Sequence, residues 1–182
     1  AEDARGSHRL VGDTFTLVRV ATAQVYDGGN GQSAGVAYTM AAGFARYDRD
    51  WASLAASDVA AAARELAQAA RDAGSLDAGV SQRVSEGARR LTFSGIDSGL
   101  YLVVRTGVAD ANKGLTCDPV LVSVPQLEDG AFAYDVDVDP KFEWADVDHP
   151  GGNGGGAEPD RGTPGWLPTT GDYVIGVVCL LV

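Results

Sequence analysis

Residues 135–143 alternate strictly between charged and apolar side chains. The charged residues are Asp135, Asp137, Asp139, Lys141 and Glu143, and the apolar ones are Val136, Val138, Pro140 and Phe142. Successive side chains of a β-strand point to opposite faces of its sheet. The pattern therefore predicts a strand with its apolar side chains against a core and Lys141 pointing outward to solvent.

Other short apolar runs, separated by turn residues, extend this pattern over most of the chain. We expect strands at 14–21, 36–44, 80–85, 90–93, 100–104, 120–124 and 134–142, and a turn at 28–31. Residues 80–85 and 90–93 are expected to form a hairpin across Glu86-Gly87. The run 100–104 is almost continuously apolar, as in a central strand. The series predicts a mainly β fold, a β-sandwich with a helix inserted on one side.

The inserted helix is expected over residues 57–73, where alanine predominates. Ser57 or Asp58 can cap its start, and Gly74 can end it. Its apolar face at helical spacing comprises Val59, Ala63, Leu66, Ala67 and Ala70. Because few of these side chains are large, we expect the helix to lie close against a sheet and to serve packing alone.

Composition excludes several functions. The net charge of −11 disfavours nucleic acid and anionic membranes as partners. The histidines, His8 and His149, lie in polar flanks, and no nucleophile elbow or metal-spaced cluster is present. The two cysteines, Cys117 and Cys179, predict no disulfide framework, and Cys117 is expected to pack as a small hydrophobe. We therefore expect neither an enzyme nor a cofactor.

A calcium site is the alternative interpretation of the acidic strand. Asp135, Asp137 and Asp139 have the spacing of a calcium-binding loop, with Asp146 at the twelfth position. Such a loop requires glycine at the sixth position, where this chain has Pro140. A solvated strand face is favoured, and no metal site is predicted.

A five-residue motif, Leu167, Pro168, Thr169, Thr170 and Gly171, stands between a glycine-rich run (150–156) and an apolar run (173–182). Proline fixes its own backbone angle and extends the preceding residue, so the peptide is preshaped for a groove. Gly171 leaves room around the Thr170 carbonyl for a nucleophile. The apolar run is shorter than the roughly 20 residues of a membrane-spanning helix, which indicates either a truncated or an unusual tail.

This motif resembles the Leu-Pro-x-Thr-Gly sorting signal of Gram-positive surface proteins. In that family a sortase cuts between the threonine and the glycine and passes the threonyl carbonyl to an amine. The resemblance makes Thr170 the acyl donor and implies export. The chain starts with a charged segment rather than a signal peptide, so we expect that a leader has been removed.

Three further segments, 99–104, 118–125 and 134–141, resemble in that order the N-terminal domain of sortase-assembled pilins. With residues 15–21 and the inserted helix, the resemblance covers about residues 12–144. It implies an immunoglobulin-like or prealbumin-like sandwich. In the family, the last strand carries a motif ending in Pro-Lys-Asn, whose lysine amine attacks the threonyl-sortase intermediate. The matching residues here are Pro140 and Lys141, with Phe142 in place of asparagine.

By this resemblance Lys141 is the acceptor amine. Its acidic neighbours favour the charged ammonium, which is not nucleophilic, so the bond is expected to need the sortase site. The alternative is a lysine that only balances an acidic strand face. Many relatives also have an internal lysine–asparagine isopeptide bond. The first strand here carries Arg19, which cannot replace an attacking amine, and we predict no such bond in this domain.

Together these features divide the chain into a polar arm (1–12), a β-sandwich domain (13–145), a Gly/Pro-rich linker (146–166) and a sorting signal with apolar tail (167–182). The expected function is that of a minor or basal pilin subunit, secreted and anchored to a Gram-positive cell wall. Its expected partners are a sortase, other pilin subunits and peptidoglycan. The alternative is a wall-anchored adhesin that binds a host surface ligand and does not polymerise.

Overall fold

The computed structural model describes residues 10–29, 33–88, 90–138, 140–144 and 174–179. The described part of the chain is mainly β. Its strands are β1 (Thr14–Tyr26), β2 (Gly35–Met40), β3 (Val80–Arg83), β4 (Arg90–Ile96), β5 (Gly99–Gly107), β6 (Leu115–Cys117), β7 (Val120–Val124), β8 (Gln126–Glu128), β9 (Ala131–Ala133), β10 (Asp135–Val138), β11 (Phe142–Trp144) and β12 (Val174–Cys179). Its helices are the α-helix α1 (Ala56–Asp72) and the 3₁₀ helices η1 (Ala42–Tyr47), η2 (Trp51–Ser53) and η3 (Asp110–Asn112).

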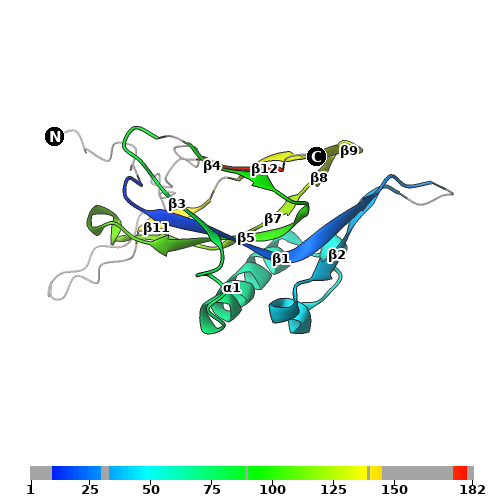
Figure 1. Ribbon diagram of the computed structural model, residues 1–182, viewed down its shortest axis with the longest axis horizontal. Helices are drawn as coiled ribbons and strands as arrows, with labels where there is room; N and C mark the ends of the chain where they lie inside the picture. The colour runs from blue at the N-terminus through cyan, green and yellow to red at the C-terminus, as the bar shows by residue number, and fades with distance from the viewer. Residues whose placement is uncertain (1–9, 30–32, 89, 139, 145–173, 180–182) are drawn as a thin grey trace, which may run out of the picture.

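The long strand β1 organises the largest sheet, whose order is β2-β1-β5-β7 (Figure 1). One edge of β1 pairs with β3 over its first residues and with β2 over its last, and the other edge pairs with β5. All these pairings are antiparallel. A second sheet has the order β10-β12-β4, and two small ladders join β11 to β6 and β8 to β9.

The two faces of the large sheet support two separate cores. Along β5, Leu100, Leu102 and Val104 pack with α1, whereas Tyr101 and Val103 belong to the cluster that contains β4 and β10. Figure 1 shows α1 on one side of this sheet and β4 and β12 on the other. Because both faces of β5 are covered, its sequence is almost continuously apolar, which confirms the expected central strand.

Helix α1 packs close to the sheet because its inner face is mostly alanine. Ala63, Leu66, Ala67 and Ala70 are buried, as predicted, whereas Val59 is only half-buried. Gly74, with a φ of 66°, follows the last turn and confirms the predicted end of the helix. The predicted cap was wrong: Ala55 holds the N-cap position without a side-chain hydrogen bond, and Ser57 and Asp58 lie inside the first turn.

Two predictions for residues 36–93 need correction. The strand expected over 36–44 ends at Met40, and η1 then turns Phe44 into the core beside α1. The predicted hairpin does not form, because β3 pairs with β1 whereas β4 pairs with β12. Backbone hydrogen bonds tie Val84 to Gly12 and Asp13, so the chain leaves the large sheet before β4 begins.

The predicted strand over 134–142 is divided between β10 and β11. β10 pairs with β12, and β11 pairs with β6. Pro140 lies between them and has no backbone N–H to continue a ladder. The expected strand over 14–21 extends to Tyr26, and the strand over 120–124 is confirmed as β7. The mainly β class is thus confirmed with an inserted helix.

Candidate functional site

Lys141 lies at the surface, in the short connection between β10 and β11. Val136, Val138 and Pro140 are buried, whereas Asp135, Asp137 and Lys141 are exposed. The alternation predicted from the sequence is confirmed for these residues, and it fixes the outward direction of the lysine. The apolar side chains on either side of Asp137 and before Lys141 are thus buried, whereas Lys141 itself is exposed.

The residue after Lys141 anchors the same connection. Phe142 is half-buried, and its ring meets that of Phe15 edge-to-face, with the centroids 6.5 Å apart and the planes at 89°. Its backbone pairs with Cys117 of β6. An asparagine at this position would give up the aromatic contact, so Phe142 has a packing role in this chain.

The acidic face around Lys141 is balanced by an arginine. Arg90 of β4 forms an ion pair with Asp137 of β10, and both side chains are about half exposed. Among the described residues, no carboxylate lies within ion-pairing distance of Lys141.

The other lysine occupies a different setting. Lys113 Nζ lies 2.8 Å from Asp110 Oδ1, and the lysine side chain is 71% exposed. It directly follows η3, which comes after the last residue of β5, and it belongs to neither β10 nor β11. Lys113 is therefore a suitable control for any chemistry assigned to Lys141.

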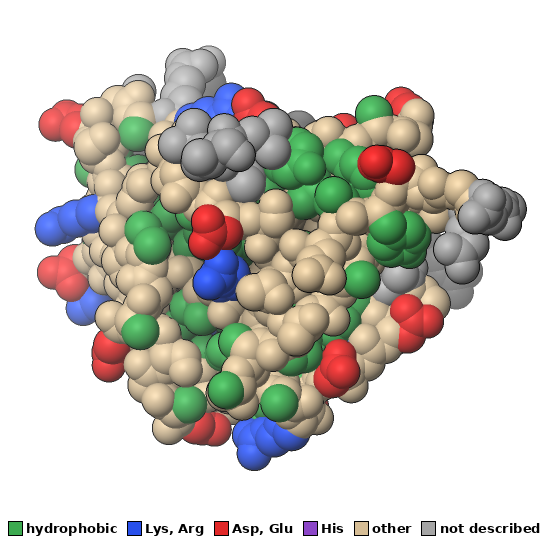
Figure 2. Space-filling model, turned by 45° about the vertical axis from the view of Figure 1, so that its right-hand side comes forward, with side chains coloured by type: hydrophobic (Ala, Val, Ile, Leu, Met, Phe, Trp, Pro, Cys, Tyr) green, Lys and Arg blue, Asp and Glu red, His purple; other side chains and the backbone are tan. Residues whose placement is uncertain are grey.

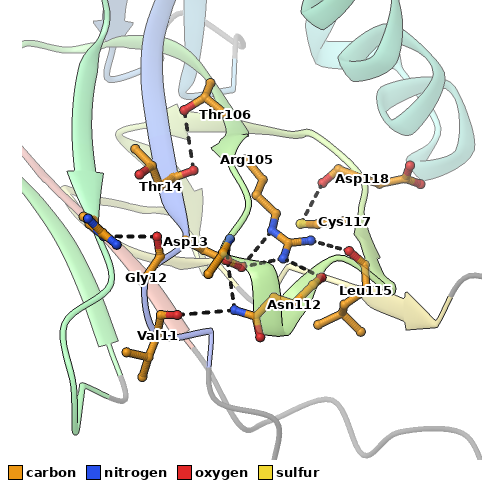
Figure 3. Close-up of polar contacts among 12 residues, drawn as sticks. Val11, Gly12, Asp13, Thr14, Arg105, Thr106, Asn112, Leu115, Cys117 and Asp118 are labelled. Carbon is orange, nitrogen blue, oxygen red and sulfur yellow. Dashed lines mark hydrogen bonds and ion pairs between the residues drawn. The ribbon is translucent and has the colours of Figure 1, made fainter.

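The sequence analysis did not anticipate a buried polar cluster around Asp13, Arg105 and Asn112. Arg105 Nη2 lies 2.5 Å from Asp13 Oδ2, and Nε donates to the same oxygen over 2.8 Å. Asp13 Oδ1 accepts hydrogen bonds from Asn112 Nδ2 at 2.9 Å and from the Ala109 backbone N–H at 2.8 Å. Figure 3 shows these groups converging where β1 begins and β5 ends. The only signal in the sequence was a charge at each of these two strand ends.

This cluster bears on the predicted absence of an internal isopeptide bond. The cation that contacts Asp13 is a guanidinium, which has no nucleophilic amine. Arg19, the residue on which the prediction was based, is exposed and pairs with Asp97 at 2.9 Å. Lys113 and Lys141 are both exposed. The absence of a crosslink stays a prediction.

Cys117 is half-buried at the edge of the core, where its Sγ donates a weak hydrogen bond to the Asp118 carbonyl oxygen over 3.5 Å. Burial raises the pKa of the Cys117 thiol to about 12, an effect that the nearby Arg105 charge only partly offsets. A thiol that remains protonated is a poor nucleophile. The expected packing role of Cys117 is confirmed.

Several predicted residues fall outside the described part of the chain. They are Leu167, Pro168, Thr169, Thr170 and Gly171 of the sorting motif, both histidines, and two members of the calcium alternative, Asp139 and Asp146. Within the described ranges, no group of three potential metal ligands gathers. None of the helices there is long and apolar enough to cross a bilayer.

Charge is dispersed over the face drawn in Figure 2. Basic and acidic side chains are spread over it, with hydrophobic ones between them.

No protein-family model matches the chain, and no curated protein matches it in sequence. Function must therefore be argued from the chain's own residues.

Proposed function

We propose that this chain is a structural pilin subunit of a Gram-positive cell surface, in a minor or basal position, and a substrate of a sortase. It is secreted, and it is joined covalently to other pilin subunits or to peptidoglycan. The observation that carries the proposal is the pairing, in one short chain, of the motif Leu167–Gly171 with an exposed lysine between β10 and β11.

The proposed chemistry is a two-step transpeptidation. The sortase thiolate attacks the Thr170 carbonyl, an acid of the enzyme protonates the Gly171 nitrogen as its bond to Thr170 breaks, and the new amino terminus leaves with the tail. The Lys141 ammonium of another subunit gives its proton to a base of the enzyme, and the free amine attacks the thioester. An amide forms and the thiolate is restored. The exposure of Lys141 supports this role, since the amine must enter the enzyme's site.

The finer fold belongs to the same proposal. We assign an immunoglobulin-like or prealbumin-like β-sandwich, with α1 as an insertion. The support is the set of core residues shared by β1, β5 and β7 on one side and by β4 and β10 on the other. A single such domain, with both donor and acceptor groups, suits a minor or basal subunit better than a long shaft subunit.

The direct test is cleavage of the purified full chain by a sortase in the presence of a glycine peptide. The expected product is a chain in which the Thr170 carbonyl is joined to the added peptide, identified by its mass. Thr170→Pro blocks the reaction if the assigned bond is the one cut. An unprocessed wild-type chain, across sortases of the different classes, contradicts the proposal.

An adhesin that does not polymerise is the second candidate, and one feature favours it. The ends of β1 and β2 form an arm that projects from the molecule in Figure 1. Val25 and Tyr26 in this arm are 41% and 47% exposed. Exposed apolar side chains on a projecting ribbon suit contact with another protein. This candidate keeps the sorting signal but does not need Lys141.

A further inference from the structure

The strand β12 completes the second sheet from an unexpected position in the sequence. It begins at Val174, just after the sorting motif, and forms the middle strand between β4 and β10. It runs parallel to β4, with Ile175 opposite Leu91, and antiparallel to β10, with Ile175 opposite Val138. The segment that a sortase would remove is therefore the strand that joins this sheet.

Within the described residues, β4 and β10 have no other strand partner. Both are fixed in place by core side chains, Leu91 and Phe93 on β4 and Val136 and Val138 on β10. The Arg90–Asp137 ion pair links the same two strands. Since neighbouring strands lie about 4.8 Å apart, β4 and β10 are separated by about 10 Å, the width that one inserted strand fills. An empty site would leave two rows of backbone N–H and C=O groups unpaired.

The register also relates the chain segment that follows β10 to the segment that precedes β12. Because β10 and β12 are antiparallel, the chain after Val138 and the chain before Ile175 leave the ladder at the same end. Lys141 is three residues from Val138, and Thr170 is five residues from Ile175. At about 3.3 Å per extended residue, these stretches reach at most roughly 10 and 17 Å. Chain length alone thus limits how far Thr170 and Lys141 can lie from this end of the ladder.

We propose that the site between β4 and β10 accepts β12 from a second copy of this chain, so that Thr170 of the donor copy comes to lie near Lys141 of the acceptor copy. Exchange of an identical element recreates the same contacts at low cost. The connection between β11 and β12, residues 145–173, contains the run Gly151-Gly152-Asn153-Gly154-Gly155-Gly156, a composition typical of flexible linkers.

Competition from the chain's own tail sets when exchange occurs. A strand tethered to its own site acts at an effective concentration on the order of millimolar, so an intact chain fills its own site at lower protein concentrations. Cleavage at Thr170 would remove this competitor and open the site to the tail of an uncleaved copy. This timing rests on the proposed function, whereas the strand site itself does not.

The first test uses the full chain with Val177→Pro and a fluorescent synthetic peptide of residues 171–182. Proline removes a ladder donor from the middle strand and so empties the site. The variant is expected to bind the peptide at least tenfold more tightly than the wild-type chain does, as measured by fluorescence anisotropy. A peptide that itself carries Val177→Pro is the matched control. Equal binding by both chains, or no binding by the variant, overturns the proposal.

If Val177→Pro does not fold alone, refolding is repeated with the peptide present. Recovery of the native circular dichroism spectrum then supports the strand site, and failure to recover rejects it. The control peptide must not rescue folding.

The second test traps exchange between copies. Cys179 lies opposite Ile96 in the β12–β4 ladder. The acceptor chain carries Ile96→Cys, Val177→Pro and Cys179→Ser, the donor chain keeps Cys179, and both carry Cys117→Ala. With dissolved oxygen as the two-electron oxidant, exchange predicts a mixed disulfide between the thiol at position 96 and donor Cys179. A chain with Asp72→Cys in place of Ile96→Cys reports random collision, and equal yields from both chains reject the exchange.

Neither test contains a sortase. A wild-type chain that no sortase cleaves would end the proposed function and leave the binding result standing. A chain that a sortase cleaves but that does not bind the strand peptide would support the proposed function and reject the strand exchange.

Discussion

Asp13 and Arg105 form an ion pair that is almost completely withdrawn from solvent. Their side chains are 0% and 4% exposed, and Arg105 Nη2 lies 2.5 Å from Asp13 Oδ2. The remaining carboxylate oxygen accepts hydrogen bonds from Asn112 and from the Ala109 backbone. The pair links the start of β1 to the end of β5, so it ties the chain entry into the domain to the central strand.

Replacing Arg105 by methionine is expected to lower the free energy of unfolding by about 3–5 kcal/mol. The substitution leaves the Asp13 carboxylate buried without its counter-charge, and that penalty exceeds the value of the intact pair. Urea unfolding measures the loss. The double variant Asp13→Leu with Arg105→Met is expected to recover much of it, because no unpaired charge remains.

Arg19→Met supplies the matched surface control. Arg19 pairs with Asp97, whose side chain is 83% exposed, and exposed pairs contribute about 0–1 kcal/mol. Losses of the same size at Arg19 and Arg105 would show that burial does not determine the effect.

Cys117 is expected to resist alkylation while the domain is folded. Burial raises its pKa from 9.0 to about 12, so at pH 8 the reactive thiolate is about a thousandfold scarcer than in the unfolded chain. The measurement is the rate of reaction with iodoacetamide in a Cys179→Ser chain, with and without urea. Equal rates in the two states would contradict the burial argument.

The same shift gives a stability prediction with a defined sign. Between about pH 9 and pH 12 the unfolded chain loses its thiol proton while the folded chain keeps it. The folded state then binds more protons, so the contribution of Cys117 to stability is complete below pH 9 and declines as the pH rises toward 12. The decline should be absent from a Cys117→Ala chain, and unfolding curves at pH 8 and pH 10 compare the two.

Phe142→Asn is expected to lower the free energy of unfolding by about 2 kcal/mol. Full burial of a phenylalanine contributes roughly 3–5 kcal/mol in such substitutions, and the value is halved here because the side chain is only half-buried. Urea unfolding again measures the change. A conservative control is Phe142→Leu, which keeps most of the apolar volume and should cost less.

The sequence predicted the parts of this fold that depend on local pattern. The alternation around Val136 and Val138 gave the buried and exposed faces correctly, since a strand with one covered face leaves a period of two. The alanine-rich face of α1 and the end at Gly74 were also predictable. Each of these features is encoded within a few neighbouring residues.

What the sequence did not predict depends on contacts between distant residues. The β3–β4 hairpin was expected from a turn at Glu86-Gly87, but β3 pairs with β1 and β4 pairs with β12. The Asp13–Arg105 pair joins residues that lie far apart in the chain, and neither has a local motif. The outward direction of Lys141 was predictable from the sequence. The pairing of β10 with β12 shortly before Lys141 was not.

Lys141→Arg is expected to abolish covalent assembly and to leave the fold intact. Arginine keeps the positive charge at this exposed position, so the free energy of unfolding should change by less than about 0.5 kcal/mol. It cannot act as the attacking amine, because the guanidinium stays protonated. On cells, the pilin proposal predicts that high-mass ladders on denaturing gels disappear, whereas the adhesin alternative predicts unchanged ladders.

Lys113→Arg is the control, since Lys113 is also exposed but pairs with Asp110 and lies outside the connection between β10 and β11. Its ladders should match those of the wild-type chain. Mass spectrometry of wall digests then identifies the bond: the wild-type and Lys113→Arg chains should yield a peptide in which Lys141 is joined to a threonyl carbonyl. A wild-type digest in which every Lys141 peptide is unmodified would refute the acceptor role, whatever the gels show.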